Sequence, residues 1–148
     1  MKKQHVAGIL MATTMLTGFE GMRRIAYYDP VGIPTVCMGE TRGVQIGDVY
    51  TLEQCKAMAT ARVTEFAAGV EADLQVPVSD KTFATFVSFS YNLGLGVFKN
   101  RIAPLANSGN LTAACQKMGE YVFAHGLKLP GLVRRRQEEV ALCLEGLK

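Results

Sequence analysis

A chain of 148 residues is long enough to fold as one domain, or as a large lobe with a small lobe attached, and to bury a core without metals or cross-links. With 49% hydrophobic and 20% charged residues, the composition excludes a disordered protein and is typical of an ordinary soluble one. The net charge of +3 is uneven, because from residue 99 onward eight Lys and Arg residues stand against four Asp and Glu residues. This basic half suits a polyanion such as nucleic acid or an anionic cell wall, although a mixed soluble surface explains the charge equally well.

The first apolar segment, Val6 to Leu16, follows two lysines and imitates a secretion signal. It is about half as long as a bilayer-spanning helix. It also leads into Glu20 without a small-residue cleavage site. We therefore expect it to form the first helix of the domain, over residues 3–21, with a shortened export signal as the alternative.

The stretch from residue 25 to residue 50 alternates β-forming residues with prolines and glycines, which predicts short strands joined by tight turns. Next come Thr51 and Gln54 with the spacing of a capping box, which predicts a long helix over residues 52–73. The sequence thus predicts a small β-containing lobe, about residues 22–50.

Four more helices are expected after this point. The first begins at Ser79 or Asp80 and carries an apolar stripe at helical spacing, which we interpret as core rather than as a cofactor site: Phe83, Phe86, Val87 and Tyr91. The other three are predicted over residues 98–106, 110–124 and 131–146. The predicted fold class is therefore α+β, with a larger helical lobe, a small β lobe and a ligand cleft between them.

Three polar residues near the junction of the two lobes have the chemistry of glycoside hydrolysis. Glu20 ends the first helix and Asp29 lies on a turn opposite, so that one carboxyl group can protonate the leaving oxygen while the other works from the far face of the sugar. The hydroxyl of Thr35 can hold the attacking water. The helix dipole and apolar neighbours disfavour the ionised form of Glu20, as a proton donor requires. Spacing alone favours a plainer arrangement, in which Glu20 pairs with Arg23 or Arg24 and the aspartate merely starts a turn.

The E-x8-D-x5-T pattern from Glu20 to Thr35 resembles the signature of the phage-type lysozymes, glycoside hydrolase family 24, and in particular that of signal-anchor-release endolysins of lambdoid phages. Further likeness lies in YTLEQCKAM, FSYNLGLGVFKN, AACQKM and PGLVRRRQEEVALC, so that it covers nearly all of the chain from about residue 15. The resemblance implies a single lysozyme-like domain over residues 1–148 and no metal or organic cofactor. It implies hydrolysis of the β-1,4 bond between N-acetylmuramic acid and N-acetylglucosamine in peptidoglycan, with host cell lysis as the outcome.

The same resemblance assigns roles by position. Glu20 corresponds to the proton donor, Asp29 to the second acid and Thr35 to the threonine that positions water in an inverting mechanism. Phe89 corresponds to a residue that lines the saccharide cleft. These four residues are the expected site.

Several further positions receive no single role. Glu40 replaces a histidine of many relatives, and Arg101 stands where some relatives contact substrate through a smaller polar side chain. The arginines at 134–136 either hold the general acid, bind anionic wall polymer or form a solvated helix face with two glutamates that follow. His5 and His125 have no partners in the sequence and are interpreted as incidental.

Four cysteines, at positions 37, 55, 115 and 143, form no C-x-x-C pair, so a zinc site is not expected. Counting alone leaves two disulfides and four buried thiols equally open. The resemblance favours oxidation in the periplasm and the local pairs Cys37–Cys55 and Cys115–Cys143.

We expect peptidoglycan rather than nucleic acid as the partner, a monomer, and transient membrane association through the N-terminal segment. The protein is expected to act in the host periplasm or on the cell wall, with export by a signal anchor or release through a holin left open. Two alternatives remain: a lytic transglycosylase, which cleaves the same bond with one acid, and a non-catalytic module that binds wall or membrane.

Overall fold

The computed structural model describes residues 5–148, so the first residues of the helix expected over 3–21 lie outside the described part of the chain. Helix α1 spans Val6–Glu20 and ends at Gly21, whose φ of 74° is accessible to glycine at little cost. Among the residues described, no helix has the length and apolar character needed to cross a bilayer.

A small lobe follows directly. Strands β1 (Arg23–Tyr28) and β2 (Pro34–Cys37) pair antiparallel, with Tyr27 opposite Thr35 and an irregular register nearer the start of β1. A separate apolar cluster lies beneath them: Val36, Cys37, Val44 and Cys55. The short strands and tight turns predicted for this segment are confirmed.

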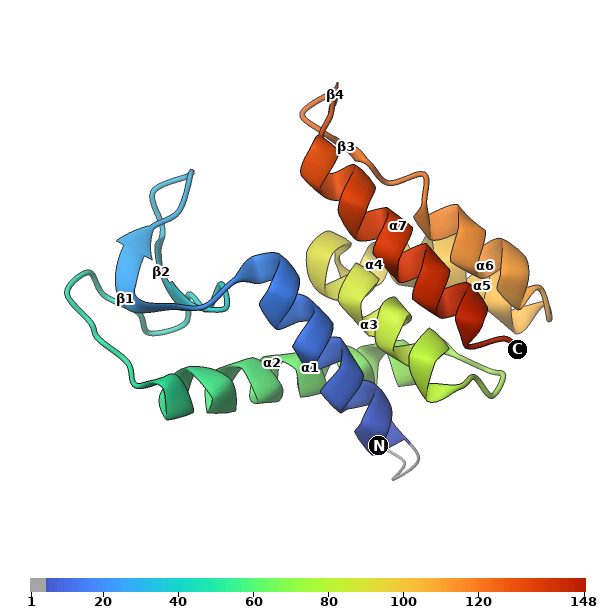
Figure 1. Cartoon of the computed structure of the whole chain (residues 1–148), viewed down its shortest axis with the longest axis horizontal. Coiled ribbons are helices and arrows are strands. Elements are labelled where there is room, and N and C mark those ends of the chain that lie inside the picture. Colours follow the sequence, from blue (N-terminus) through green and yellow to red (C-terminus); the bar gives the residue numbers. More distant parts are fainter. Residues whose placement is uncertain (1–4) are drawn as a thin grey trace.

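Two long helices form much of the helical lobe, and the second of them lies at its centre. Helix α2 (Leu52–Asp73) begins with the predicted capping box. The side chains of Thr51 and Gln54 each accept a hydrogen bond from the backbone amide of the other residue. Helix α3 (Asp80–Leu93) is capped by Ser79, and all of its residues from Thr82 to Ser90 are buried. Helix α3 contacts α1, α2 and α7 (Pro130–Glu145), which makes it the central element of the fold (Figure 1).

The remaining helices are short. The stretch predicted as one helix over 98–106 consists of a π-helical turn, η2 (Phe98–Ile102), followed by α5 (Ala103–Asn107), with α4 (Leu95–Val97) just before. Helix α6 covers Leu111–Met118.

The helix predicted over 110–124 is wrong beyond Met118. A second hairpin, β3 (Phe123–Ala124) and β4 (Leu127–Lys128), occupies this stretch. It turns at two residues with positive φ, His125 at 52° and Gly126 at 78°, and this left-handed pair is the geometry of a tight two-residue hairpin turn.

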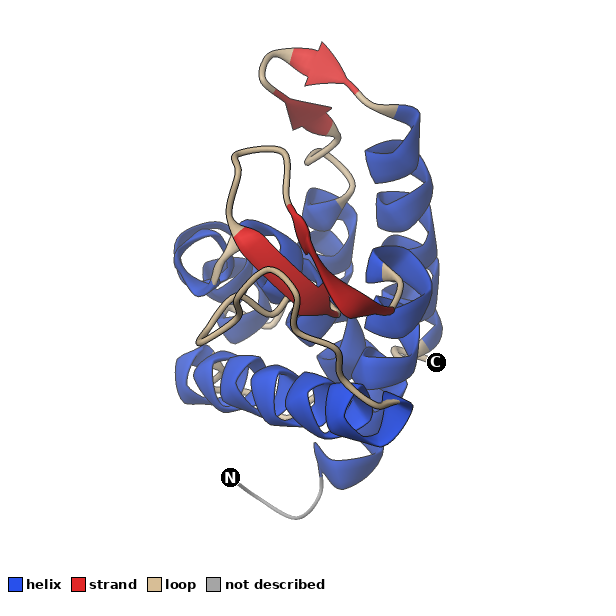
Figure 2. Ribbon diagram, turned by 90° about the vertical axis from the view of Figure 1, so that its left-hand side faces the viewer, coloured by secondary structure: helices blue, strands red, loops and turns tan. Residues whose placement is uncertain are grey.

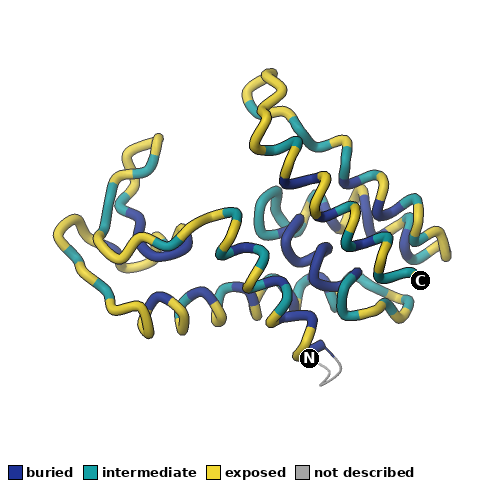
Figure 3. Tube along the Cα trace, viewed as in Figure 1, coloured by how far each residue is buried: buried dark blue, intermediate teal, exposed yellow. Residues whose placement is uncertain are grey.

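The side view shows the β1–β2 sheet crossing in front of the helices, with the β3–β4 hairpin at the top of the view (Figure 2). Burial concentrates in the helical lobe, whereas the β3–β4 hairpin and much of β1 are exposed and β2 is buried against the rest of the small lobe (Figure 3). The fold is therefore α+β, with a small hairpin lobe beside a larger helical lobe, as the sequence predicted.

Candidate active site

Glu20 is the last residue of α1, and its side chain retains 29% exposure. Its Oε1 accepts a hydrogen bond from Nη1 of Arg135 on α7 at 2.7 Å. Arg135 itself is 8% exposed. The partner of Glu20 is therefore a buried arginine far along the chain, and not Arg23 or Arg24 as the expected surface pair required.

Arg135 belongs to a buried polar cluster between α3 and α7. Its Nη2 donates to the Ser88 carbonyl at 3.2 Å, and its Nε lies 3.5 Å from the Glu139 carboxylate. Glu139 also accepts from the Ser88 hydroxyl at 2.6 Å and pairs with Arg136, which donates in addition to the Asn92 side chain. These polar contacts fix the orientation of the guanidinium that holds Glu20.

The three arginines at 134–136 thus divide into two environments. Arg134 is exposed, but Arg135 and Arg136 are buried, so the interpretation as a solvated helix face is wrong for these two. Burial lowers the pKa of Arg136, against the opposing charge of Glu139. Glu139 pairs with both guanidinium groups, and an opposing charge of this kind is the condition under which buried cations are tolerated.

Asp29 fixes the turn between β1 and β2. Its Oδ1 accepts the backbone amides of Val31 at 2.9 Å and Ile33 at 2.8 Å. Both of these contacts use one oxygen, so Oδ2 is available to a ligand or a water. The turn expected to start at Asp29 is present. Its two hydrogen bonds orient the carboxyl group and use only Oδ1.

Thr35 lies on β2 and is only 4% exposed. Its hydroxyl donates to the Ile33 carbonyl at 2.8 Å. Because a hydroxyl has one proton, the interaction left to Thr35 is acceptance through its lone pairs.

The structure places the three sequence-predicted polar residues on consecutive elements. Glu20 ends α1, Asp29 is at the turn of the hairpin that follows and Thr35 is on the returning strand. Within the described residues no direct hydrogen bond joins the three side chains. A donor carboxyl on a helix end and a second carboxyl with an acceptor hydroxyl on a hairpin can address opposite sides of one bond.

Glu40, in the turn after β2, is also paired. Its Oε1 accepts from Nη2 of Arg62 on α2 at 2.8 Å and from the amides of Thr41 and Arg42 at 3.0 Å each. Burial pushes the pKa of Glu40 upward, but the Arg42 amide and the Arg62 charge outweigh it and hold the pKa below the ordinary 4.5. Glu40 is therefore ionised at neutral pH, and its carboxylate bonds both the turn backbone and α2.

Comparison with known proteins decides the family. A family profile described as phage lysozyme matches residues 17–139. The chain belongs to the phage lysozyme family. A SAR-endolysin of Pseudomonas phage phiKMV is 36% identical over 145 residues, which cover 94% of this chain and 89% of that protein.

Solved structures agree with this family. The muramidase domain of SpmX from Asticaccaulis excentricus is 27% identical, with a TM-score of 0.85 and coverage of 97% of this chain and 99% of that one. The active form of P1 phage endolysin Lyz is 25% identical, with a TM-score of 0.83 and coverage of 93% and 85%. Membership confirms the lysozyme-like fold and supports a peptidoglycan-lytic enzyme.

Phe89 does not fit the cleft-lining role that the family resemblance implied. It is fully buried on α3, edge-on to Tyr121 at 5.3 Å and beneath the Arg136 guanidinium at 5.2 Å. Its spacing of three residues from Phe86 was the available sign that it continues the buried stripe. Arg101, by contrast, is exposed on η2.

Both disulfides implied by the family resemblance are present. Cys37–Cys55 joins β2 to α2 with an S–S distance of 2.10 Å, and Cys115–Cys143 joins α6 to α7 with one of 2.03 Å. Among residues 5–148, no three His, Cys, Asp or Glu side chains are grouped so as to hold a metal.

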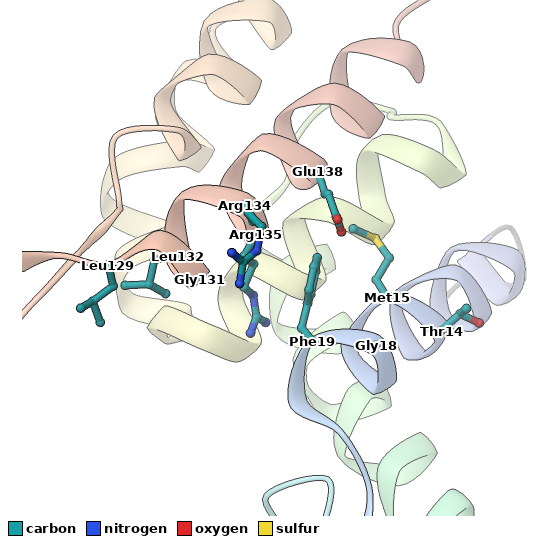
Figure 4. Close-up of a pocket in the computed structure, with 10 residues that line it drawn as sticks. All are labelled: Thr14, Met15, Gly18, Phe19, Leu129, Gly131, Leu132, Arg134, Arg135 and Glu138. Carbon is teal, nitrogen blue, oxygen red and sulfur yellow. The ribbon is translucent and has the colours of Figure 1, made fainter.

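A cavity of about 780 Å³ lies between α1 and the start of α7 (Figure 4). Its walls include Met15, Phe19 and Leu132 together with Arg134 and Arg135. None of the three candidate catalytic side chains lines it, although Arg135, which binds Glu20, does.

One sequence-based interpretation of the arginines at 134–136, that they hold the general acid, fits Arg135, but the residues that orient these arginines were missed. Ser88 and Asn92 are polar residues four positions apart on an otherwise apolar buried helix, which was the available signal for an inward-facing polar cluster. Glu139 was recognised as a helical neighbour of the arginines, but as a surface one.

Proposed function

We propose that this phage lysozyme is a muramidase, which hydrolyses the β-1,4 bond between N-acetylmuramic acid and N-acetylglucosamine and thereby lyses the host cell. The observation that carries the proposal is the fixed carboxyl group of Glu20, held by buried Arg135 at the helix end from which the Asp29 hairpin starts. Relatives named as endolysins and a muramidase support the same activity.

Each residue has one role in the proposed reaction. Glu20 gives a proton to the glycosidic oxygen as the bond to the leaving sugar breaks. A water attacks the anomeric carbon from the other face, and Asp29 takes a proton from this water through Oδ2. Thr35 accepts a hydrogen bond from the same water. Direct attack by water inverts the anomeric configuration.

The proposal extends to where and how the enzyme works. It acts on the wall from the periplasmic side, as a monomer with a single domain over residues 1–148, and its basic C-terminal half attracts it to an anionic wall. The SAR-endolysin names of the relatives support export through a signal anchor and a transient membrane association of the N-terminal segment.

Glu20→Gln and Asp29→Asn test the assignment in a wall-clearing assay. Each variant is expected to lose at least about 100-fold in rate, since general acid–base assistance contributes 10²–10⁴-fold. Circular dichroism and thermal melting show whether each remains folded. Glu53→Gln, an exposed carboxylate in the first turn of α2, is the matched control and is expected to retain full activity.

The products separate this proposal from its alternatives. Hydrolysis gives reducing muramic acid ends, and proton NMR of freshly formed product gives the anomeric configuration. Anhydromuramic ends in the mass spectrum would replace the hydrolase with a lytic transglycosylase. Clearing that survives the double change at Glu20 and Asp29 would indicate a non-catalytic module.

A further inference from the structure

The turn after β2 is connected to both long helices of the helical lobe by side chains with no role in the proposed reaction. The Cys37–Cys55 disulfide connects it to α2. The Glu40–Arg62 pair connects it to α2 a second time, and a hydrogen bond from Tyr91 connects it to α3. Three independent connections converge on residues 37–42.

The Glu40–Arg62 connection is well shielded and multiply bonded. Glu40 and Arg62 are 14% and 19% exposed, so the attraction between them is less screened than in a surface pair. The other end of the Arg62 guanidinium lies 3.2 Å from Glu65, which also forms a two-point contact with Arg42. The carboxylate of Glu40 thus fixes both the turn backbone and the helix it faces.

The Tyr91 connection is a single hydrogen bond from a rigid support. The hydroxyl donates to the Met38 carbonyl at 2.7 Å, and the ring packs against Phe66 at 5.1 Å. Burial, with repulsion from the nearby Glu20 carboxylate, raises the pKa of Tyr91 to about 12. The hydroxyl therefore remains a donor throughout the neutral pH range.

The position of Tyr91 links this connection to the candidate acid. Its neighbours Ser88 and Asn92, on the same stretch of α3, hold the arginines of the cluster that binds Glu20. Thr35 precedes Cys37 by two residues on β2, so a displaced turn would displace Thr35. One short stretch of α3 therefore contacts both sides of the candidate site.

We propose that Glu40 and Tyr91 are positioning residues, which hold the β2 turn against α2 and α3 and so keep Thr35 and Asp29 in place opposite Glu20. The proposal rests on the proposed muramidase reaction. Neither side chain touches the reacting atoms, and both act through the backbone that carries Thr35.

Tyr91→Phe and Glu40→Gln test it with minimal changes in shape. Tyr91→Phe removes only the hydroxyl, and Glu40→Gln removes only the charge. On a soluble chitooligosaccharide or muropeptide we expect kcat to fall about tenfold, the equivalent of one strong hydrogen bond, with KM within about twofold. Tyr121→Phe is the control, because within the described residues the Tyr121 hydroxyl makes no hydrogen bond, and it is expected to leave both constants unchanged.

A distance measurement separates positioning from general destabilisation. Spin labels on cysteines introduced at exposed Val31 and Lys99 report the separation of the hairpin from the helical lobe by double electron–electron resonance. We expect a broader distribution with Tyr91→Phe or Glu40→Gln than with Tyr121→Phe. An unchanged distribution, or an unchanged kcat in both variants, overturns the proposal. Failure of the muramidase assignment is seen separately, as clearing that survives Glu20→Gln.

Discussion

Arg134 and Arg135 are adjacent in sequence but differ in what surrounds them. Arg135 is buried between Glu20 and Glu139, whereas Arg134 is exposed. Removing one partner of a buried ion pair leaves uncompensated charge, so Arg135→Ala is expected to lower the free energy of unfolding by about 3–5 kcal/mol. Arg134→Ala is expected to change it by less than about 0.5 kcal/mol. Urea denaturation measures both, and equal losses would contradict the division described above.

The lowered pKa of Glu40 leads to a prediction about the stability of the folded protein in acid. Because the pKa of Glu40 in the folded protein is lower than its ordinary 4.5, the carboxylate stabilises the fold fully above that value, and the contribution disappears as pH falls through the folded-state pKa. Urea denaturation from neutral pH to well below 4.5 should therefore show wild type and Glu40→Gln converging as pH falls. A gap between the two curves that stays constant, or widens, in acid would be the contrary result.

Individual residues show which parts of the candidate site can be predicted from sequence and which cannot. Glu20, Asp29 and Thr35 can be proposed from the sequence because the family pattern that joins them depends on local spacing. Arg135 lies 115 positions from Glu20, so no local pattern pairs the two. The match between Glu40 and Arg62 likewise exists only after the turn has folded onto α2.

At the scale of elements, α1 offers a matched pair of glycines. A Cβ added to Gly8 would lie 2.9 Å from the Phe83 ring and 3.3 Å from the Asp80 carbonyl, whereas one added to Gly18 would meet nothing within 4 Å. Alanine is favoured over glycine inside a helix by about 0.5–1 kcal/mol. We therefore expect Gly18→Ala to stabilise the protein and Gly8→Ala to destabilise it by loosening α1 from α3. Thermal melting of the two variants decides, and a gain at both positions would contradict the close approach.

The elements with strong local signals were predicted well, and the others were not. The capping box at Thr51 and the cap at Ser79 fix helix starts through contacts within three residues. The helix expected over 110–124 failed beyond Met118 because these residues form a hairpin that turns at His125 and Gly126, and the Leu129 amide closes it by donating to the Val122 carbonyl at 3.0 Å. The π-helical turn at 98–102 has no sequence signature that distinguishes it from an α-helix.

At the scale of the whole molecule, the two disulfides cross-link different elements: one joins β2 to α2, and the other joins α6 to α7. Cys37–Cys55 and Cys115–Cys143 close loops of 18 and 28 residues, and each is expected to contribute about 2–4 kcal/mol to the free energy of unfolding. Replacing either pair with alanines should lower stability by this amount. Only loss of Cys37–Cys55 should also lower kcat, because that bond secures the strand that carries Thr35. Urea denaturation and turnover on soluble substrate measure the two effects, and a similar fall in kcat for both pairs would contradict the distinction.

Because α3 lies at the centre of the fold, we expect the two parts of the candidate site to differ in how often their backbone opens to solvent. Its residues from Thr82 to Ser90 are buried beneath three other helices, so their amides exchange with deuterium only when those helices separate. Native-state hydrogen exchange should find the slowest amides there and much faster ones at the exposed tip of the β1–β2 hairpin beside Asp29. The arginine that holds Glu20 is itself bonded to the segment that we expect to open most rarely, whereas Asp29 lies on one that we expect to open far more often.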